Sequence, residues 1–237
     1  MHLQYLKRFF PELSKKKILD VGCGTGKFLE ECRAENINAV GFDSDPNHVK
    51  NCKERLKTMN IFTAQAENVP LKDESFDFIN CTGTLEHTND PIRVLKECYR
   101  LLKKDGEMFI TVCNKYAIKD PHYHLWFLNW LPPKLKLKYS RITKSKRIID
   151  SYDKESRLFR KKHTRQGIDE LNYHSYREFK KIVKEIGFKI RDARLIQLNN
   201  PEMMINSKLR KFAKPLKLIY KLTTIFWQQS FHFILKK

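Results

Sequence analysis

The chain has 237 residues, of which 41% are hydrophobic and 12% aromatic, so it can fold around a substantial core and is not expected to be disordered. Its formal net charge is +20 at pH 7. No apolar run approaches the roughly 18 residues of a membrane-spanning helix, and the first residues lack the apolar stretch of a secretion signal. We therefore expect a cytoplasmic protein with one large domain, or one domain with an insert.

The positive charge is confined to the second half of the chain. Residues 1–114 contain 17 basic and 17 acidic residues, whereas residues 115–237 contain 30 and 10. All six cysteines lie in the neutral first half, with no Cys-x-x-Cys pair and no histidines at zinc-finger spacing. This pattern predicts reduced cysteines in a protein core and no metal site.

In the first half, short apolar runs alternate with segments whose apolar residues recur at helical spacing. The expected strands cover residues 17–21, 39–43, 61–64, 75–81 and 107–113. The expected helices cover residues 26–34, 46–59 and 91–102. This alternation predicts a doubly wound α/β fold with a mostly parallel sheet, in which ligands bind beyond the carboxyl ends of the strands.

A glycine-rich loop, residues 20–26 with the sequence DVGCGTG, follows the first expected strand and opens a helix. Glycines allow positive φ angles and a close approach of the backbone to a ligand. Lys27 stands where a dinucleotide fingerprint has glycine, and the loop lacks the Gly-Lys-Ser/Thr of a phosphate loop. The loop indicates a nucleotide-type ligand, although a tight turn in an unrelated α/β domain has the same pattern.

Asp43 ends the second expected strand, about 20 residues after the glycine loop begins. A carboxylate at this place can accept hydrogen bonds from both ribose hydroxyls of an adenosine. The alternative role is a helix cap, but Asp45, directly before Pro46, fits that role better. We therefore predict that Asp43 binds a ribose.

Six stretches of the first half resemble class I S-adenosylmethionine-dependent methyltransferases, in the broad group that includes the ubiquinone and menaquinone methyltransferases. The matching stretches are ILDVGCGTG (18–26), VGFD (40–43), AENVPL (66–71), SFDFI (75–79), LEHTNDP (85–91) and RLLKKDGEMFIT (100–111). The resemblance covers about residues 15–114. It implies S-adenosylmethionine as the cofactor and a Rossmann-like methyltransferase fold, with a seven-stranded sheet whose last strand is antiparallel.

The cofactor-binding residues that this resemblance implies lie at the ends of the first four strands. The methionine part would contact Asp20, Gly22 and Gly24, with Cys23 and Gly26 in the same loop. The ribose would contact Asp43, the adenine would be flanked by Gln65, Ala66 and Glu67, and the sulfonium would lie near Cys81 and Thr82. Many relatives have aspartate where this chain has Gln65, so the adenine contact departs from the family pattern.

A hydroxyl acceptor must also lose its proton, usually to a base within hydrogen-bond reach. His87, just after the fourth strand, is the best-placed candidate, with Glu86 beside it. The alternative is that this pair orients the helix that follows. His122 and His124 are second candidates, because they lie in the segment expected to cover the acceptor side, although a loop histidine is more often structural.

The second half predicts three further elements of the fold. A helix begins after Ser175, which forms a capping box with Glu178, and ends at Gly187. Strands are expected at residues 188–196 and 230–235, and the last would pair antiparallel.

The rest of the second half is additional to the fold. We divide the chain into a cofactor-binding half at residues 1–114, a basic aromatic insert at 115–172 that caps the acceptor, and the remainder of the fold at 173–237. The last part includes an amphipathic segment at about 199–229. Its lysines beside apolar residues are typical of a helix on an anionic membrane surface or, equally, of a lid that packs on the sheet.

These features predict an O-methyltransferase for a small or lipid-linked acceptor, such as a sugar, a glycolipid or a quinone-like molecule, at the cytoplasmic face of a membrane. An RNA-modifying methyltransferase is the first alternative, because a basic half can bind nucleic acid through its phosphates. A non-catalytic protein that binds the cofactor is the second alternative.

Overall fold

The computed structural model describes residues 2–57, 60–122, 124–132, 135, 138–139, 142–143, 171–203 and 211–237. Most of the lysine- and arginine-rich stretch of the insert, up to Arg165, lies outside the described residues. So does the part of the predicted amphipathic segment at residues 204–210.

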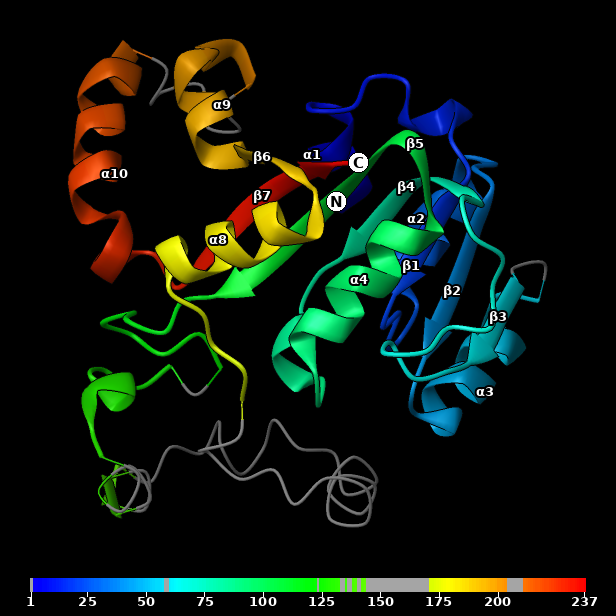
Figure 1. Ribbon diagram of the computed structural model, residues 1–237, viewed down its shortest axis with the longest axis horizontal. Helices are drawn as coiled ribbons and strands as arrows, with labels where there is room; N and C mark the ends of the chain where they lie inside the picture. The colour runs from blue at the N-terminus through cyan, green and yellow to red at the C-terminus, as the bar shows by residue number, and fades with distance from the viewer. Residues whose placement is uncertain are drawn as a thin grey trace.

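A seven-stranded sheet forms the centre of the molecule, in the order β3-β2-β1-β4-β5-β7-β6 (Figure 1). The strands are β1 Ile18–Val21, β2 Ala39–Asp43, β3 Asn60–Thr63, β4 Phe76–Cys81, β5 Leu102–Cys113, β6 Lys189–Asp192 and β7 Ser230–Lys236. Strands β1 to β5 pair in parallel, and β7 is antiparallel to both of its neighbours, β5 and β6. The predicted doubly wound, mostly parallel sheet with an antiparallel last strand is confirmed.

Helices cover both faces of this sheet. The helices are α1 His2–Lys7, α2 Lys27–Ala34, α3 Pro46–Arg55, α4 Pro91–Leu101, α8 Tyr176–Ile186, α9 Ala193–Asn199 and α10 Ala213–Trp227. Short 3-10 helices are η1 Leu13–Lys15, η2 Leu85–His87, η3 Leu128–Trp130 and η4 Pro201–Met203. One buried core packs the sheet against α4 and α8, and a second core packs it against α1, α2 and α3.

Successive residues of the central strands point to these two cores in turn. On β5, Met108 and Ile110 belong to the core beneath α4 and α8, whereas Phe109 between them belongs to the other core. This is the two-residue alternation of a strand. The central strands are buried on both faces, which explains why they read in the sequence as continuous apolar runs.

Helices α3, α4 and α8 begin where the sequence predicts them. Asp45 Oδ1 accepts a hydrogen bond from Asn47 N at 2.8 Å, and Asp90 Oδ1 accepts one from Arg93 N at 3.0 Å. A proline follows each aspartate at the first helical position, where its missing N–H costs nothing. The capping box of Ser175 at the start of α8 is also present.

The predicted strand at residues 188–196 is wrong in its second half. Strand β6 ends at Asp192, and helix α9 begins at Ala193. The cause is the Asp192 side chain, whose Oδ1 accepts a hydrogen bond from Leu195 N at 3.0 Å and thereby caps a helix.

Two other boundaries differ from the prediction by more than one residue, and helix α1 was missed. Strand β5 starts at Leu102 instead of residue 107, and Asp105 within it has a positive φ of 62°. Helix α3 ends at Arg55 instead of residue 59. Helix α1 was not predicted, because its six residues are too few to show a helical period.

The amphipathic segment contains helix α10, as predicted, and this helix packs against α9. Asp192 joins the two helices to α8, because its Oδ2 accepts hydrogen bonds from Tyr220 Oη at 2.9 Å and Tyr176 Oη at 3.0 Å. Among the described residues, no helix has the length and apolar character needed to cross a membrane.

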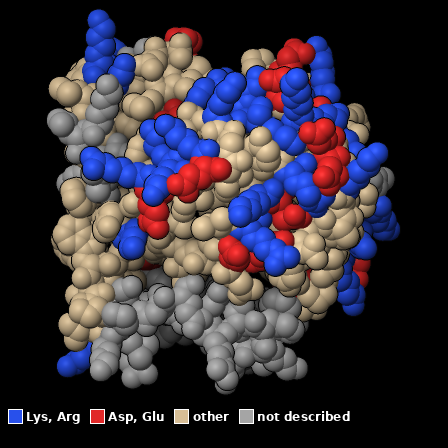
Figure 2. Space-filling view, viewed as in Figure 1, with Lys and Arg blue, Asp and Glu red and all other residues tan. Residues whose placement is uncertain are grey.

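Charges of both signs mix on the face that carries α4 and α8 (Figure 2). Several basic residues of the described chain are paired with acidic ones, for example Arg191 with Glu107 at 2.6 Å and Lys103 with Asp77 at 2.9 Å. The described residues on this face therefore do not form a patch of one sign.

Candidate active site

The glycine loop turns sharply between β1 and α2. Gly22, Gly24 and Gly26 have φ angles of 67°, 51° and 73°, in the left-handed region that other residues rarely adopt. A Cβ on Gly22 would lie 2.5 Å from Thr84 Cγ2, whereas a Cβ on Gly24 would meet nothing within 4 Å. The loop thus packs tightly at Gly22 and leaves open room at Gly24, where a ligand can approach the backbone.

Asp43, at the carboxyl end of β2, holds this loop in place. Its Oδ2 accepts a hydrogen bond from Gly24 N at 2.8 Å, and its Oδ1 accepts one from Asp45 N at 2.9 Å, with His48 Nδ1 at 3.4 Å. Burial raises the pKa of Asp43, but these hydrogen bonds outweigh it and hold the pKa below its usual value. Asp43 is therefore an ionised acceptor at the edge of the loop, the character that the sequence predicted.

Asp20 is the second acid of this region, and it is buried within β1. Its Oδ1 accepts a hydrogen bond from Asn80 Nδ2 at 2.7 Å, and Asn80 Oδ1 lies 3.0 Å from His2 Nε2. Burial raises the pKa of Asp20 to about 7, and the Asn80 bond only partly opposes this. A cation beside Asp20 would favour the ionised form of this carboxyl group and lower its pKa.

Two cysteines assigned to the cofactor have side chains in the protein cores. Cys81 is fully buried beneath α4, and Cys23 belongs to the opposite core. Burial raises the pKa of both thiols, so they act as small apolar side chains. Only their main-chain atoms can face a ligand, whereas Thr82, next to Cys81, is half-buried.

The predicted adenine-flanking residues lie in the turn after β3. Gln65 is exposed and Ala66 is buried. Glu67 Oε1 accepts hydrogen bonds from Asn89 N at 2.8 Å and Asp90 N at 3.3 Å, so this carboxylate fixes the start of α4.

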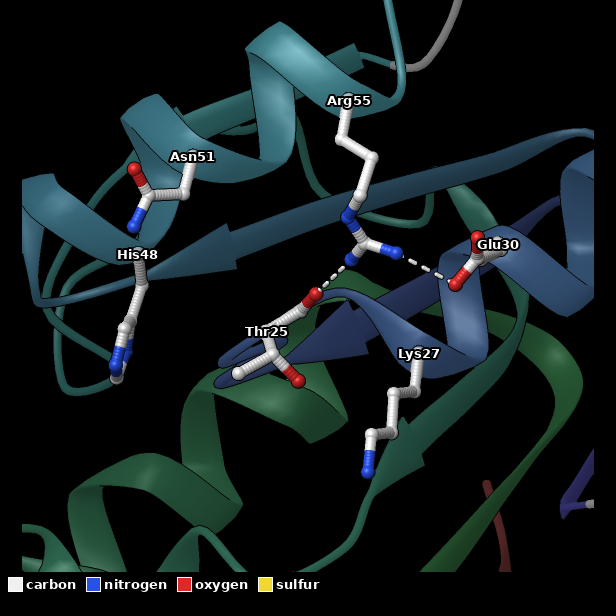
Figure 3. Close-up of a pocket in the computed structure, with 6 residues that line it drawn as sticks. All are labelled: Thr25, Lys27, Glu30, His48, Asn51 and Arg55. Carbon is white, nitrogen blue, oxygen red and sulfur yellow. Dashed lines mark hydrogen bonds and ion pairs between the residues drawn. The ribbon is translucent and has the colours of Figure 1, made fainter. Parts of the chain in front are cut away.

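A hollow of about 310 Å³ opens on the outer side of the glycine loop, between α2 and α3 (Figure 3). Its lining residues are Thr25, Lys27, Glu30, His48, Asn51 and Arg55. Arg55 spans it, with hydrogen bonds to Thr25 O and to Glu30 Oε2. His48 lines the hollow and also lies 3.4 Å from Asp43, whereas the lining includes no residue from the carboxyl ends of β4 and β5.

The acceptor-side candidates meet beyond the carboxyl ends of β4 and β5. Glu86 Oε1 lies 3.4 Å from His122 Nε2, and the rings of His87 and His122 are 4.9 Å apart between centroids. Burial alone would raise the pKa of Glu86. The neighbouring His122 and His87 have the larger opposite effect, so the pKa of Glu86 lies below its usual value. The three residues form one cluster of a carboxylate and two imidazoles, which we call the acceptor-side cluster.

His124, the fourth candidate, does not join this cluster. It is exposed, with a positive φ of 55°, and its N–H donates to Asp120 O. Residues that sequence reasoning missed do line the cluster: Cys113 Sγ donates to Glu86 Oε1 at 3.5 Å, and Tyr173 stacks on His122 at 6.1 Å. No spacing pattern in the sequence identifies these two residues.

Thr84 connects the glycine loop to the acceptor-side cluster. Its Oγ1 donates to Val21 O at 2.8 Å, and its side chain packs against Gly22. Because Thr84 O also accepts a hydrogen bond from His87 N, the two parts share one edge of the sheet. The fold and site define a Rossmann-like protein with a nucleotide-type loop beside a cluster of polar, ionisable side chains.

Similarity to known proteins narrows this broad class to one family. The family model of the methyltransferase domain matches residues 3–193. The chain is 30% identical over 126 residues to a demethylmenaquinone methyltransferase of Thermotoga maritima, a match that covers 51% of this chain and 55% of that protein. It is 32% identical over 124 residues to a ubiquinone biosynthesis O-methyltransferase of Actinobacillus pleuropneumoniae, with 48% and 53% covered.

Among solved structures, an S-adenosylmethionine-dependent methyltransferase from Mesorhizobium loti matches 99% of this chain and 96% of its own, with a TM-score of 0.59 and 13% identity. That likeness concerns the fold alone. The chain spans about half the length of the curated relatives it matches.

The chain belongs to the methyltransferase domain family. The predicted family, its Rossmann-like fold, its enzyme class and its cofactor, S-adenosylmethionine, are thereby confirmed at the level of the family.

Proposed function

We propose that the protein transfers the methyl group of S-adenosylmethionine to a hydroxyl oxygen of a small acceptor, with a quinol-like ring as the favoured class. The observation that carries the proposal is the acceptor-side cluster of Glu86, His87 and His122. It lies at the same edge of the sheet as the glycine loop, and Thr84 joins the two.

The residues of the first half fit the cofactor. Gly24 leaves open room above the loop, and Asp43 is an ionised acceptor for ribose hydroxyls. The buried Asp20 provides an acidic group at the end of β1, where the cationic methionine part would lie. The cofactor supplies a methyl group on a sulfonium, an electrophile that mainly requires a nucleophile held in line.

The acceptor-side cluster can then prepare the nucleophile. A hydroxyl is a weak nucleophile until its proton is drawn away. Glu86 is buried and ionised, and His122 Nε2 lies 3.4 Å from its Oε1, so the cluster offers a carboxylate and two imidazoles to a hydroxyl hydrogen. We propose that it orients the acceptor oxygen and removes its proton.

The quinol-like class is supported by the relatives and by the insert. Of the two relatives described above, one is named a demethylmenaquinone methyltransferase and the other a ubiquinone biosynthesis O-methyltransferase. His122 lies in a hairpin bridged by Lys119 and Trp126, and Trp126 and Phe127 in this hairpin are about half exposed. Such aromatic side chains can pack against an apolar, planar acceptor.

A lipid-linked acceptor is supported by the outer surface of α10. Leu218, Ile219 and Phe226 are exposed there, on a helix that also carries Lys214 and Lys217. Exposed apolar residues beside lysines favour contact with an anionic membrane. We propose that this helix brings the site close to acceptors dissolved in a membrane.

The experiment follows labelled methyl from S-adenosylmethionine into an extract that is separated into organic, polar small-molecule and polymer fractions. The proposal expects label in the organic fraction. It also expects Glu86→Gln to lower transfer by about 10²–10⁴-fold while the cofactor still binds. Glu185→Gln, an exposed carboxylate on α8, is the matched control and leaves transfer unchanged.

Other outcomes contradict the proposal in different ways. Nuclease-sensitive label in the polymer fraction would mean that the basic half binds RNA. No transfer in any fraction, with the cofactor bound, would favour a non-catalytic protein. A Glu86→Gln variant as active as the wild type would remove the cluster from the reaction.

A further inference from the structure

The acceptor-side cluster has the composition and spacing of a metal site. Glu86, His87 and His122 each offer one ligand atom, and all of these atoms lie within 4.8 Å of one another. We propose that these three residues bind one divalent transition-metal ion, with Zn²⁺ as the reference ion. The sequence predicted no metal site, because His122 is separated from Glu86 and His87 by more than 30 residues.

The donor set selects the kind of ion. Two imidazole nitrogens and one carboxylate oxygen suit Zn²⁺, Fe²⁺ and related ions, and two histidines with one glutamate form the ligand set of several catalytic zinc sites. Magnesium and calcium prefer sites made of oxygen ligands. The cluster therefore favours a first-row transition metal.

Binding of a metal ion at these three residues requires little movement of their ligand atoms. Ligand atoms at 2.0–2.1 Å around a tetrahedral zinc lie about 3.3 Å apart. Glu86 Oε1 and His122 Nε2 are already 3.4 Å apart. A small rotation of the His87 ring, which lies edge-on to His122, would complete the set.

One oxygen of Glu86 points independently to a cation. Glu86 is 3% exposed, and its Oε2 is buried without a hydrogen-bond partner among the described residues. A buried carboxylate oxygen left without a donor is costly, and native proteins rarely keep one without a reason. A metal ion bound at this oxygen supplies the missing partner.

The ligands are held by the surrounding structure. The main-chain N–H of His122 donates to Asp120 Oδ1 at 2.9 Å, and the His122 ring stacks on Tyr173. The His87 N–H donates to Thr84 O, which fixes the end of η2. These contacts fix the main chain at both histidines and the plane of the His122 ring.

Cys113 is a support and not a fourth ligand. Its Sγ donates to Glu86 Oε1 at 3.5 Å and lies 3.9 Å from His122 Nε2. The ligand atoms that all lie within 4.8 Å of one another belong to Glu86, His87 and His122, so the Cys113 sulfur is outside this set. Three protein ligands thus leave a coordination position open to an outside molecule.

The consequence for the reaction rests on the proposed function. An acceptor hydroxyl at the open position would lose its proton more readily, because a bound divalent ion stabilises the oxyanion. The proton leaves to solvent, the new O–CH₃ bond forms, and the S–CH₃ bond of the cofactor breaks with its electron pair going to sulfur. Glu86 and the two imidazoles would then act through the metal ion and not directly as bases.

The test titrates the untagged full chain, freed of metal by a chelator, with Zn²⁺ and separately with Co²⁺. We expect one equivalent to bind, with Co²⁺ giving the visible absorption of a site with nitrogen and oxygen ligands. Glu86→Gln and His122→Asn are expected to weaken Zn²⁺ binding by roughly a hundredfold or more. His124→Asn, which changes an exposed imidazole in the same hairpin, is the control and keeps the affinity within about threefold.

Two results would overturn the proposal: no stoichiometric binding by the wild-type chain, or equal affinity in the wild type and both cluster variants. Circular dichroism and cofactor titration of each variant show whether it is folded. Methyl transfer that persists in excess chelator would reject the metal and keep the proposed function. Metal binding without any methyl transfer would keep the metal site and reject the proposed function.

Discussion

The two halves of the chain differ in how their parts of the site are encoded. In the neutral first half, the glycine loop, Asp20 and Asp43 lie within about 25 residues of one another, at the ends of adjacent strands. In the basic second half, His122 and Tyr173 reach the cluster from segments more than 50 residues apart. The comparison teaches that the cofactor side is a local property of the sequence, whereas the acceptor side is a property of tertiary packing.

The largest loss of folding stability is expected at Gly22, where the glycine loop packs most closely against Thr84. In Gly22→Ala, the new Cβ would meet Thr84 at 2.5 Å with a φ of 67°. Left-handed strain and overpacking together should cost about 2–5 kcal/mol of the free energy of unfolding, measured by urea denaturation. Gly24→Ala is the matched control, since its Cβ meets nothing, and it should cost only about 1–2 kcal/mol. Equal losses would show that the contact with Thr84 does not matter.

Removal of the ribose acceptor comes next. Asp43→Ala takes away the carboxylate that holds Gly24 N and faces the predicted ribose position. Hydrogen bonds to a charged group contribute about 1.5–3 kcal/mol, so the dissociation constant for S-adenosylmethionine should rise by roughly 10- to 150-fold. Isothermal titration checks this, with Glu54→Ala on the exposed side of α3 as the control. Undiminished affinity would contradict the assignment of Asp43.

A smaller effect is expected from the network that ties the second half together. Asp192→Asn weakens the hydrogen bonds from Tyr176, Tyr220 and Leu195 N. We expect a loss of about 1–3 kcal/mol of unfolding free energy, since bonds to the charged carboxylate are replaced by weaker ones. Cofactor affinity should stay within about twofold. A large loss of cofactor affinity would contradict the view that the cofactor site in the first half does not depend on this network.

The smallest effect is a pH dependence of cofactor binding. The pKa of Asp20 is raised to about 7, so the carboxyl group is mostly protonated below this pH and mostly ionised above it. The ionised form attracts the cationic methionine part, so affinity should rise severalfold between about pH 6 and pH 7.5. Titrations across this range test the expectation. In Asp20→Asn the rise should disappear, and a rise that persists would assign it to another group.

The sequence predicts most of the fold, because its signals are local. Alternating apolar runs, the glycine loop and the capping residues Asp45, Asp90 and Ser175 each report on a few neighbouring residues. The error at residues 188–196 has the opposite origin. Apolar residues there suit a strand, but Asp192 caps a helix that α10 and Tyr220 hold in place.

The sequence locates some candidate-site residues better than others, because only some of their positions follow from local signals. Asp43 and the loop glycines have the expected geometry, whereas Cys23 and Cys81 turn their side chains into the cores. Of the two loop histidines, only His122 reaches Glu86. Nothing in their spacing distinguishes His122 from His124, because the choice depends on how the hairpin folds over β4 and β5.

The central claim is that the cofactor loop and the acceptor-side cluster act together to methylate an oxygen. The most direct measurement uses S-adenosylmethionine with a ¹³C-labelled methyl group and identifies the bonded atom in the purified product by NMR. The account predicts a methyl group on the oxygen of a small acceptor, formed by the wild type and lost in Glu86→Gln. A methyl group on carbon, on nitrogen or in RNA, formed equally well by both proteins, would contradict it.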